Sequence, residues 1–533
     1  MLSSLAILVF LVLLYVIVGR KGNWPDGPRG PFMFGTLQQK KKKLHWNQEL
    51  ASHIPHYGDF FSINMGKAKV VVLSSPTAVD DLIVKRGQKY SSRPSSSPTG
   101  RIVAQSRLGQ TPYGEEFRRH RKLVHSILGM QNAKIFMPYQ EYESRQVLKN
   151  LLDQPTTFYT EVHRYSASVT FSLLLGARFV SPDTKIPREI QNKMYEMFAA
   201  TRPGYWFADR VPLLNYLPDA LAPWRAKAHR IFDHLIEFWG VFYDSMEERI
   251  KKGDAPDCFI KRFLESPEVV DFTEIDRRIV LSELLSAGAE TTATNLQWFF
   301  KAAVLYPEAV KKAQQELDEV IGRDRFPTWE DRQQLPYIVA FVDELHRWGS
   351  PSPLAFYHAT SEVDTYRGKT IPAQTTVIYN AGAIHHSDMY YRQHKDFIPE
   401  RFLPEKDTRH MPNYAHAQMH YGYGVGRREC PGKHVAESSL FIVISRILWA
   451  FDIGTGSHPL PGPETAGSIP ILAPAKFHCV VTPRDQSTAS KIGEEAKYQD
   501  PSLRVEDAAQ YEDDVAKVVA RQKAEALGVK EWI

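Results

Sequence analysis

The period of the hydrophobic positions changes several times along the chain. Between residues 55 and 75 apolar and polar positions alternate as in short β-strands, and from about 76 to 345 apolar positions recur at helical spacing. Strand-like alternation returns between about 355 and 382, and a further short strand pair is predicted near 469 to 482. This order predicts a mainly α fold of the α+β class.

The first segment, Met1 to Gly19, contains no charged side chain. As a helix it would reach about 28 Å, close to the thickness of a hydrocarbon core, so it predicts a transmembrane anchor. A cleaved signal peptide is the alternative, but no basic residues precede the apolar run and no A-x-A-like site follows it. The basic residues that follow predict a cytosolic location for the remainder of the chain. They are Arg20, Lys21, Arg29 and Lys40 to Lys43.

The composition changes at two boundaries after this anchor. Residues 20–45 form a proline-rich and basic linker that is expected to be stiff. Residues 46–484 contain no internal repeat and no Gly/Ser-rich linker, so we expect one large domain. The tail, residues 485–533, is polar and charged. It predicts one helix at about Val505 to Leu527 and otherwise a loosely docked or disordered extension.

Composition excludes several classes of protein. The chain is 43% apolar and 12% aromatic, which suits a folded protein with a substantial core. Three cysteines are too few for a disulfide scaffold or a multi-cysteine zinc site. The net charge of +5 is modest, and no basic stripe with interleaved aromatics suggests nucleic acid.

The loop from Tyr423 to Gly432 surrounds one cysteine with glycines. Because proline favours the first turn of a helix, Pro431 predicts that Cys430 lies at a helix N-terminus, where a thiolate is favoured. Arg428 offers a forked cation for a carboxylate. The glycines that allow the main chain to approach a flat ligand are Gly424, Gly426 and Gly432. These are the needs of a cysteine-ligated haem, although the loop alone also fits a surface turn with an inert cysteine.

Residues 281–292 place small and polar side chains inside a long helical pattern. Gly288 is expected to let a planar ligand or O2 approach the backbone. Glu290 and Thr291 offer an acid and an alcohol that can relay protons into a dry pocket. A solvent-facing patch on an ordinary helix is the alternative.

Two further groups of charged residues have both a functional and an ordinary interpretation. Glu344 and Arg347 are spaced as a common surface pair, but Arg401 follows a proline-fixed turn and would complete a buried Glu-Arg-Arg network. A basic helical face either binds an acidic partner or is solvated. It comprises Arg118, Arg119, Arg121 and Lys122.

Together these segments resemble the cytochrome P-450 family of haem-thiolate monooxygenases, in the family's own order over nearly all of residues 25 to 484. The resemblance lies in the proline-rich hinge (Pro25 to Pro31), the oxygen-binding groove (Ala287 to Thr292), the core ion network (Glu344 to Arg347 with Pro399 to Phe402) and the haem loop (Tyr423 to Gly432). It implies the P-450 fold, with a large helical domain and a small β-rich lobe, and heme b as cofactor.

The resemblance also assigns roles to residues. Cys430 would be the axial thiolate on the haem iron, and Glu290 and Thr291 the proton-delivery pair. The structural triad would be Glu344, Arg347 and Arg401. Three residues match positions that hold the haem propionates: Arg121, Arg428 and His358. His358 stands where many members have arginine, so its bond is expected to be weaker and pH-sensitive.

Two residues depart from the family pattern. Tyr423 stands where phenylalanine usually packs beside the cysteine, and its hydroxyl needs a partner if it is buried. Phe117 replaces a tryptophan that donates to a propionate, so one hydrogen bond of about 1 kcal/mol is lost and haem binding depends more on Arg121.

The family implies insertion of one atom of O2 into a C–H bond, with two external electrons. Nothing in the chain resembles a flavin or nicotinamide domain, so the electrons are expected from an NADPH-cytochrome P-450 reductase at the endoplasmic reticulum membrane. The docking residues would be Arg118, Arg119, Lys122 and Lys433. Two alternatives are an O2-independent haem-thiolate isomerase or dehydratase and a non-catalytic haem sensor.

The substrate is expected to be a small or medium apolar, or aromatic, molecule rather than a carboxylate-anchored fatty acid. Segments that form the family's pocket walls carry few charges here and contain Trp206, Phe207, Leu213, Leu354, Phe356 and Ile469. Trp348 and the run from Pro203 to Trp206 are closest to fungal microsomal members that tailor secondary metabolites. A catabolic hydroxylase of simple aromatics is the alternative.

Overall fold

The computed structural model describes residues 23–28, 45–65, 68–94, 98–105, 107–181, 183–201, 205–403, 420–468, 471–497, 503 and 505–528. The helices are α2 (Trp46–Ala51), α3 (Ile54–Tyr57), α4 (Pro76–Val79), α5 (Gly87–Tyr90), α6 (Pro98–Val103), α7 (Glu115–Leu128), α8 (Met130–Ala133), α9 (Met137–Asp153), α10 (Phe158–Leu175), α11 (Ile186–Thr201), α12 (Phe207–Arg210), α13 (Pro223–Lys252), α14 (Phe259–Leu264), α15 (Glu274–Leu305), α16 (Pro307–Val320), α17 (Pro336–Trp348), α18 (Ala381–His385), α19 (Lys433–Ala450), α20 (Gln486–Glu495) and α21 (Glu512–Gly528).

The strands are short. They are β1 (Phe60–Met65), β2 (Ala68–Leu73), β3 (Ala177–Arg178), β4 (His358–Ala359), β5 (Asp364–Tyr366), β6 (Lys369–Ile371), β7 (Thr376–Tyr379), β8 (Phe451–Gly454), β9 (Thr465–Ser468), β10 (Ile471–Pro474), β11 (Val480–Pro483) and β12 (Glu506–Asp507).

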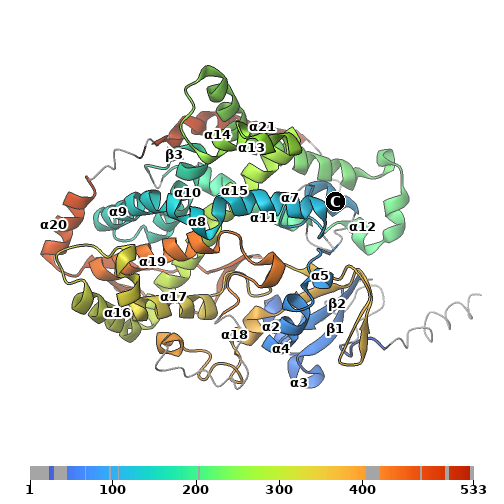
Figure 1. Ribbon diagram of the computed structural model, residues 1–533, viewed down its shortest axis with the longest axis horizontal. Coiled ribbons are helices and arrows are strands. Elements are labelled where there is room, and N and C mark those ends of the chain that lie inside the picture. Colours follow the sequence, from blue (N-terminus) through green and yellow to red (C-terminus); the bar gives the residue numbers. More distant parts are fainter. Residues whose placement is uncertain are drawn as a thin grey trace, which may run out of the picture.

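The helices form one large body, and the main sheet lies beside it with α2 to α5 (Figure 1). That sheet has the order β1-β2-β7-β4, in which β2 and β7 run parallel and the other pairs are antiparallel. The strands predicted at 55–75 and 355–382 therefore exist; β4 and β7 join β1 and β2 in one sheet, while β5 and β6 form a separate hairpin. The mainly helical architecture with a small β lobe is confirmed.

Two buried helices form the centre of the body. α15 begins at a capping box in which Thr273 and Asp276 satisfy each other's backbone N–H groups, and it runs for 32 residues. Most of its residues are buried, as are those of α19 from Ser438 onward. A helix that is buried on most of its circumference carries no broad polar face, so neither helix is strongly amphipathic.

The strand pair predicted near 469–482 is wrong in its partners. β10 pairs with β9, and β11 pairs with β8, both antiparallel. Each strand was identified near its correct position, but β9 and β10 form a hairpin, and the partner of β11 is β8, which precedes that hairpin in the chain. Strand propensity reports a strand's existence and not its neighbour.

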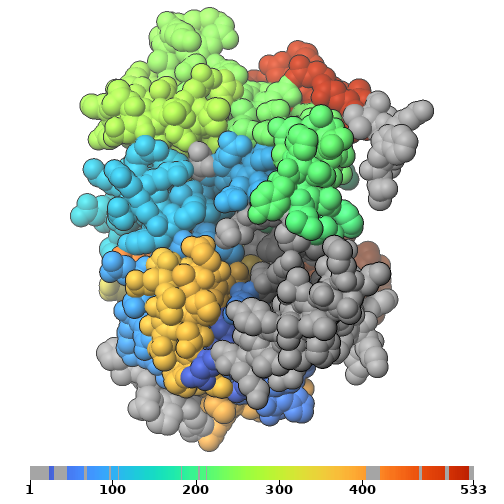
Figure 2. Space-filling view, turned by 90° about the vertical axis from the view of Figure 1, so that its right-hand side faces the viewer, coloured from blue at the N-terminus to red at the C-terminus, as the bar shows by residue number. Residues whose placement is uncertain are grey.

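The tail is docked, contrary to the expectation of a loose extension. β12 pairs in parallel with β3, and Arg249 forms a bidentate ion pair with Glu506 at 2.7 Å for both bonds. Tyr511 is buried and packs edge-on against Phe242 of α13, at 5.2 Å between ring centroids. α21 follows and lies along α13, where Figure 2 shows it in red at the surface.

The predicted membrane anchor, residues 1–19, lies outside the described residues. Among the residues that are described, no helix is both long and apolar enough to cross a bilayer.

Candidate functional site

Cys430 lies just before α19, at the end of the predicted glycine-rich loop. Its N–H donates to the Tyr423 carbonyl at 2.8 Å, which closes the loop. α19 starts at Lys433 with Gly432 as its N-cap, so Pro431 precedes the helix instead of occupying its first turn as expected. The Cys430 side chain is accessible, yet desolvation by the surrounding protein raises the pKa of its thiol, while the Gly432 N–H and the Arg121 charge lower it. A reachable but enclosed thiol is suited to a ligand that enters the protein.

The glycines of the loop have different roles. Gly424 and Gly426 adopt left-handed backbone angles, with φ of 71° and 66°, which other residues rarely do. A Cβ at Gly426 would also lie 2.9 Å from the Ile83 carbonyl oxygen. A Cβ at Gly432 would meet no protein atom closer than 3.7 Å, and it would lie 4.0 Å from the Cys430 sulfur. The protein alone does not require glycine at 432, so the space beside the sulfur is left free.

Arg428 is held above the loop by main-chain carbonyls. Its guanidinium donates to Ser91 O, Leu108 O and Thr111 O at 2.7 to 3.0 Å and lies 3.6 Å from the centre of the Phe117 ring. Burial and the nearby Arg93 and Arg121 charges lower its pKa to about 8. The Phe117 ring therefore makes a cation–π contact with this guanidinium. Sequence analysis considered only the hydrogen bond that phenylalanine cannot make and did not predict this contact.

Three guanidinium groups share this region, of which Arg93 is buried and Arg121 and Arg428 are half-buried. Burial lowers the pKa of Arg93 to about 10 and also lowers that of Arg121. Arg93 donates to Gly109 O, Phe356 O and Tyr357 O, while Arg121 donates to Glu429 O at 2.7 Å. A guanidinium has five donors, and carbonyls take only some of them here. The cluster formed by Arg93, Arg121 and Arg428 is thus suited to an anion, and a haem with two propionates fits it.

His358 adjoins this cluster but brings no charge to it. Its Nδ1 lies 2.7 Å from the Tyr90 carbonyl oxygen, to which the neutral ring donates. Burial and the charges of Arg93 and Arg428 lower its pKa to about 3. A neutral imidazole that donates from Nδ1 offers a lone pair at Nε2, so this arrangement does not support His358 as a propionate donor. Arg93 is the third cation of the cluster, and sequence analysis did not identify it. An isolated arginine in a loop cannot be distinguished in the sequence from one that is exposed to solvent.

The open side of α15 is formed by Ala287 and Thr291. Ala287 is exposed within a helix that is otherwise mostly buried, and the Thr291 hydroxyl donates to Ala287 O at 2.8 Å. Gly288 faces the other way, contrary to the expectation of a ligand contact. A Cβ there would lie 2.6 Å from Thr170 Oγ1 on α10. Its small size therefore allows α10 and α15 to pack closely.

Glu290 also faces away from Thr291. It is buried between α15, α10 and α11, where it accepts a hydrogen bond from Gln191 Nε2 at 2.7 Å. The described hydrogen bonds include none between the Glu290 carboxylate and the Thr291 hydroxyl. The acid and the alcohol predicted as a pair thus occupy different helical faces in this structure, as expected from about 100° per residue.

The structure brings the predicted triad together. Arg347 donates from Nε and Nη2 to Glu344 at 2.6 and 2.7 Å, and Arg401 Nε approaches the same carboxylate at 3.3 Å. All three are at most 2% exposed. The remaining Arg347 donors bind the carbonyls of His385, His394 and Asp396 at 2.8 Å. The network joins α17 to the segment that leads toward the cysteine loop.

Tyr423 packs on the α17 side of the loop. Its ring centroid lies 4.7 Å from that of His346, and its buried hydroxyl has no partner among the described residues. Both His346 ring nitrogens are likewise buried without a described partner. The hydroxyl that sequence analysis expected to need a partner does not have one here.

The basic face predicted on α7 is exposed at three of its residues. They are Arg118, Arg119 and Lys122. Lys433 is only partly accessible and pairs with Glu429 at 3.1 Å. A groove of about 400 Å³ between α7 and α14 contains Arg119 and Lys122.

The residues predicted for the substrate wall divide into three groups. Leu354 and Trp206 are buried, and Phe356 is 40% exposed with its ring near Phe198 and Arg93. Phe207 and Leu213 are 64% and 77% exposed. Ile469 lies outside the described residues.

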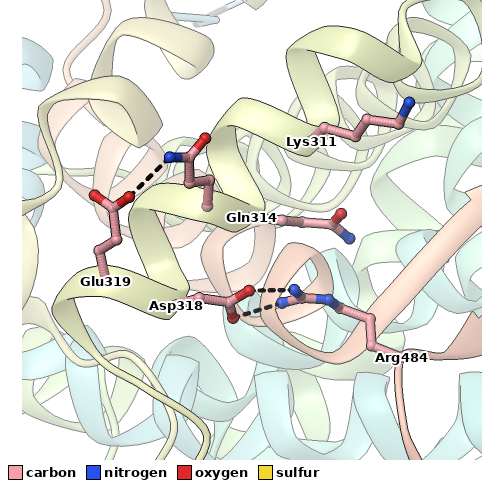
Figure 3. Close-up of a pocket in the computed structure, with 6 residues that line it drawn as sticks. Lys311, Gln314, Asp318, Glu319 and Arg484 are labelled. Carbon is pink, nitrogen blue, oxygen red and sulfur yellow. Dashed lines mark hydrogen bonds and ion pairs between the residues drawn. The ribbon is translucent and has the colours of Figure 1, made fainter.

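A second pocket, of about 350 Å³, lies at the outer surface of α16 (Figure 3). Its polar groups satisfy one another, since Arg484 pairs with Asp318 and Gln315 donates to Glu319. None of the predicted site residues lines it.

Comparison with known proteins agrees with the geometry. The family model described as Cytochrome P450 matches residues 25–478. The chain is 36% identical to the cytochrome P450 monooxygenase polD of Polytolypa hystricis, over 84% of this chain and 87% of the relative. It is 33% identical to verL of Clonostachys rogersoniana, over 89% and 90%. It is 32% identical to cytochrome P450 monooxygenase 231 of Postia placenta, over 93% and 96%. The chain belongs to the cytochrome P450 family of monooxygenases.

Proposed function

We propose that the protein is a membrane-anchored haem-thiolate monooxygenase that inserts one atom of O2 into a C–H bond of an apolar or aromatic small molecule. The observation that carries this proposal is the accessible Cys430 thiol beside the guanidinium groups of Arg93, Arg121 and Arg428, in which the charges of Arg93 and Arg121 lower the pKa of Arg428. A thiolate suits iron, and the cations suit two carboxylates.

Haem b, when bound, would supply the iron that activates O2 with two external electrons. Cys430 would hold the iron as a thiolate, which the Gly432 N–H and the Arg121 charge stabilise. Arg93, Arg121 and Arg428 would hold the propionates. The Ala287 side of α15 would leave room above the cofactor.

Proton supply is the part that the remaining residues would provide. Thr291 Oγ1 lies at the open side of α15, where it can donate or accept a proton. Glu290 can hold a proton in the buried space behind it. Apolar walls with few charges would keep water from the reacting C–H bond.

The substrate is proposed to be a secondary-metabolite intermediate, with a catabolic hydroxylase of simple aromatics as the alternative. The partly open Phe356 ring and the buried Leu354 beside it favour an apolar compound. The fungal relatives are consistent with either.

Electrons would come from a membrane-bound NADPH-dependent reductase. The reductase would dock on the exposed basic face of this protein formed by Arg118, Arg119 and Lys122, with Lys433 at the edge of that face. The anchor proposed at residues 1–19 would hold both proteins at the endoplasmic reticulum membrane.

A carbon monoxide spectrum tests the proposal. The reduced protein with CO should show the red-shifted Soret band of a thiolate-ligated haem, and Cys430→Ala should abolish it. The matched control is Cys479→Ala, which removes a buried cysteine and should retain the band. A normal band in Cys430→Ala would refute the assignment. Shifts of the ferric Soret band on adding candidate ligands would then identify the substrate class.

A further inference from the structure

The buried carboxylate of Glu290 has a histidine as its charged partner. Nδ1 of His163, on α10, lies 3.6 Å from Glu290 Oε2. Glu290 forms no other ion pair with the described residues. α10, α11 and α15 contact one another around this pair (Figure 1). Because the partner is histidine and not lysine or arginine, the charge opposite Glu290 can change with pH.

The two side chains differ in their access to solvent. The Glu290 side chain is 4% exposed, and the His163 side chain is 16% exposed. Solvent therefore reaches the imidazole more readily than it reaches the carboxylate. This geometry makes His163 a point at which a proton can enter.

Gln297 provides His163 with a partner that suits either protonation state. The two Nε2 atoms are 2.7 Å apart, so the amide donates to a neutral ring as it is oriented here. The Gln297 Oε1 atom is buried and has no partner among the described residues. A half-turn of the amide would place Oε1 on His163 Nε2, where it can accept a proton from the imidazolium.

We propose that His163 supplies protons to Glu290 from solvent, which deepens the proposed function and rests on it. The imidazolium passes the proton from Nδ1 to Glu290 Oε2, which leaves a neutral ring with its remaining proton at Nε2, and a neutral acid. The Glu290 carboxylate faces α10 and α11 in this structure, so its side chain must rotate before that acid reaches the Thr291 side of α15. Thr291 Oγ1 then accepts this proton as its own hydroxyl proton moves toward the open side, and the carboxylate returns to His163.

The other titratable groups around the pair do not change charge in the same range. Tyr159 of α10 and Tyr195 of α11 have pKa values raised by burial and by Glu290, so they stay neutral. The Lys476 ammonium lies 5.5 Å from the Tyr159 ring centre. Desolvation lowers the pKa of His163 below its usual value, and the Glu290 charge offsets only part of this effect, so the imidazolium is a stronger acid toward Glu290 than a free histidine would be.

Coupling of O2 use to product formation tests the proton supply. In the full-length enzyme, His163→Gln should raise the ratio of peroxide to product about tenfold, below the 10²-fold typical of direct acid catalysis. The parent should lose coupling as pH rises through the pKa of His163, and the variant should show no such step. The matched control is His234→Gln, which removes a histidine that is 17% exposed and pairs with Glu525 at 3.0 Å. Parent-like coupling and pH profile in His163→Gln, or the same change in His234→Gln, would overturn the proposal.

A second measurement needs no turnover. In histidine-labelled ferric protein, the NMR signal lost in His163→Gln identifies this ring, and its pKa should fall by about one unit in Glu290→Gln. An unchanged pKa would show that the two groups are not coupled and would overturn the proposal. A parent with no thiolate-type CO band would instead overturn the proposed function, so the two failures are distinguishable.

Discussion

Tyr511 is the largest of the apolar side chains that dock the C-terminal extension, which makes Tyr511→Ala its sharpest test. Tyr511 is 3% exposed and packs on Phe242 of α13. Truncation of a buried aromatic residue lowers stability by about 3–5 kcal/mol, and a site at the edge of the domain should fall near 3. The Arg249–Glu506 pair contributes less, because Glu506 is 44% exposed and exposed pairs contribute about 0–1 kcal/mol.

The loss should appear as local opening of the extension. A change of about 3 kcal/mol raises the opened population on the order of 100-fold, so trypsin should cut α21 correspondingly faster. Lys517, Arg521 and Lys523 are the cleavage sites in this helix. The fragments are identified by mass and their rates are compared at equal protease concentration.

Asp513→Asn is the control, because Asp513 is exposed and its substitution should change stability by less than about 0.5 kcal/mol. Equal cleavage rates in Tyr511→Ala and the parent would refute the docking argument. Rapid cleavage of α21 in the parent, as fast as in denaturant, would do so as well.

Three further predictions concern other buried or charged groups. Tyr423→Phe should raise the unfolding free energy by about 1 kcal/mol, since it removes a buried hydroxyl without a described partner; a lower thermal midpoint would show that the hydroxyl is bonded. Glu344→Gln should lower stability by about 3–5 kcal/mol in thermal unfolding, because two buried guanidinium groups lose their counter-charge, and an unchanged midpoint would contradict this. The hydrogen bond from Arg249 lowers the pKa of Glu506 in the folded protein. Glu506 therefore stabilises docking above its unfolded pKa of about 4.3, and this stabilisation is lost as the pH falls through the lower folded pKa. Hydrogen exchange of β12 should accelerate over that range in the parent and not in Glu506→Gln.

Sequence reasoning succeeded where the information was local. Spacing in the sequence identified the cysteine loop and anticipated that Glu344 and Arg347 pair, because residues one turn apart must share a helical face. Arg401 joins this pair from a distant segment, and the proline-fixed turn before it suggested its place in the network. The same helical geometry places Glu290 and Thr291 about 100° apart on α15, so the sequence alone already argued against a direct contact between them. Local patterns do not report which distant element packs against a face.

Contacts between distant segments account for most of what the sequence did not predict. Gly288 is small because Thr170, more than a hundred residues earlier, packs against it. Tyr511 finds its partner on α13 in the same way, although the tail's polar composition predicted a loose extension. A polar segment with a few well-placed apolar side chains can dock, since composition averages over the residues that make the contact.

Shielded arginines of this protein fall into two kinds: those with a carboxylate partner, which stabilise the fold, and those beside other cations, which are suited to bind an anion. Arg164 and Arg428 are both largely shielded from water, yet their pKa values move in opposite directions. Glu143 and Glu161 raise the pKa of Arg164 through ion pairs, so its charge is neutralised within the fold. Arg428 is instead surrounded by carbonyls and by two further cations, which lower its pKa. Keeping such a cluster buried destabilises the free protein, and an anion that enters beside Cys430 would relieve that destabilisation. The cost therefore points to a ligand with negative charge at this site, independently of the Cys430 thiol and of any sequence comparison.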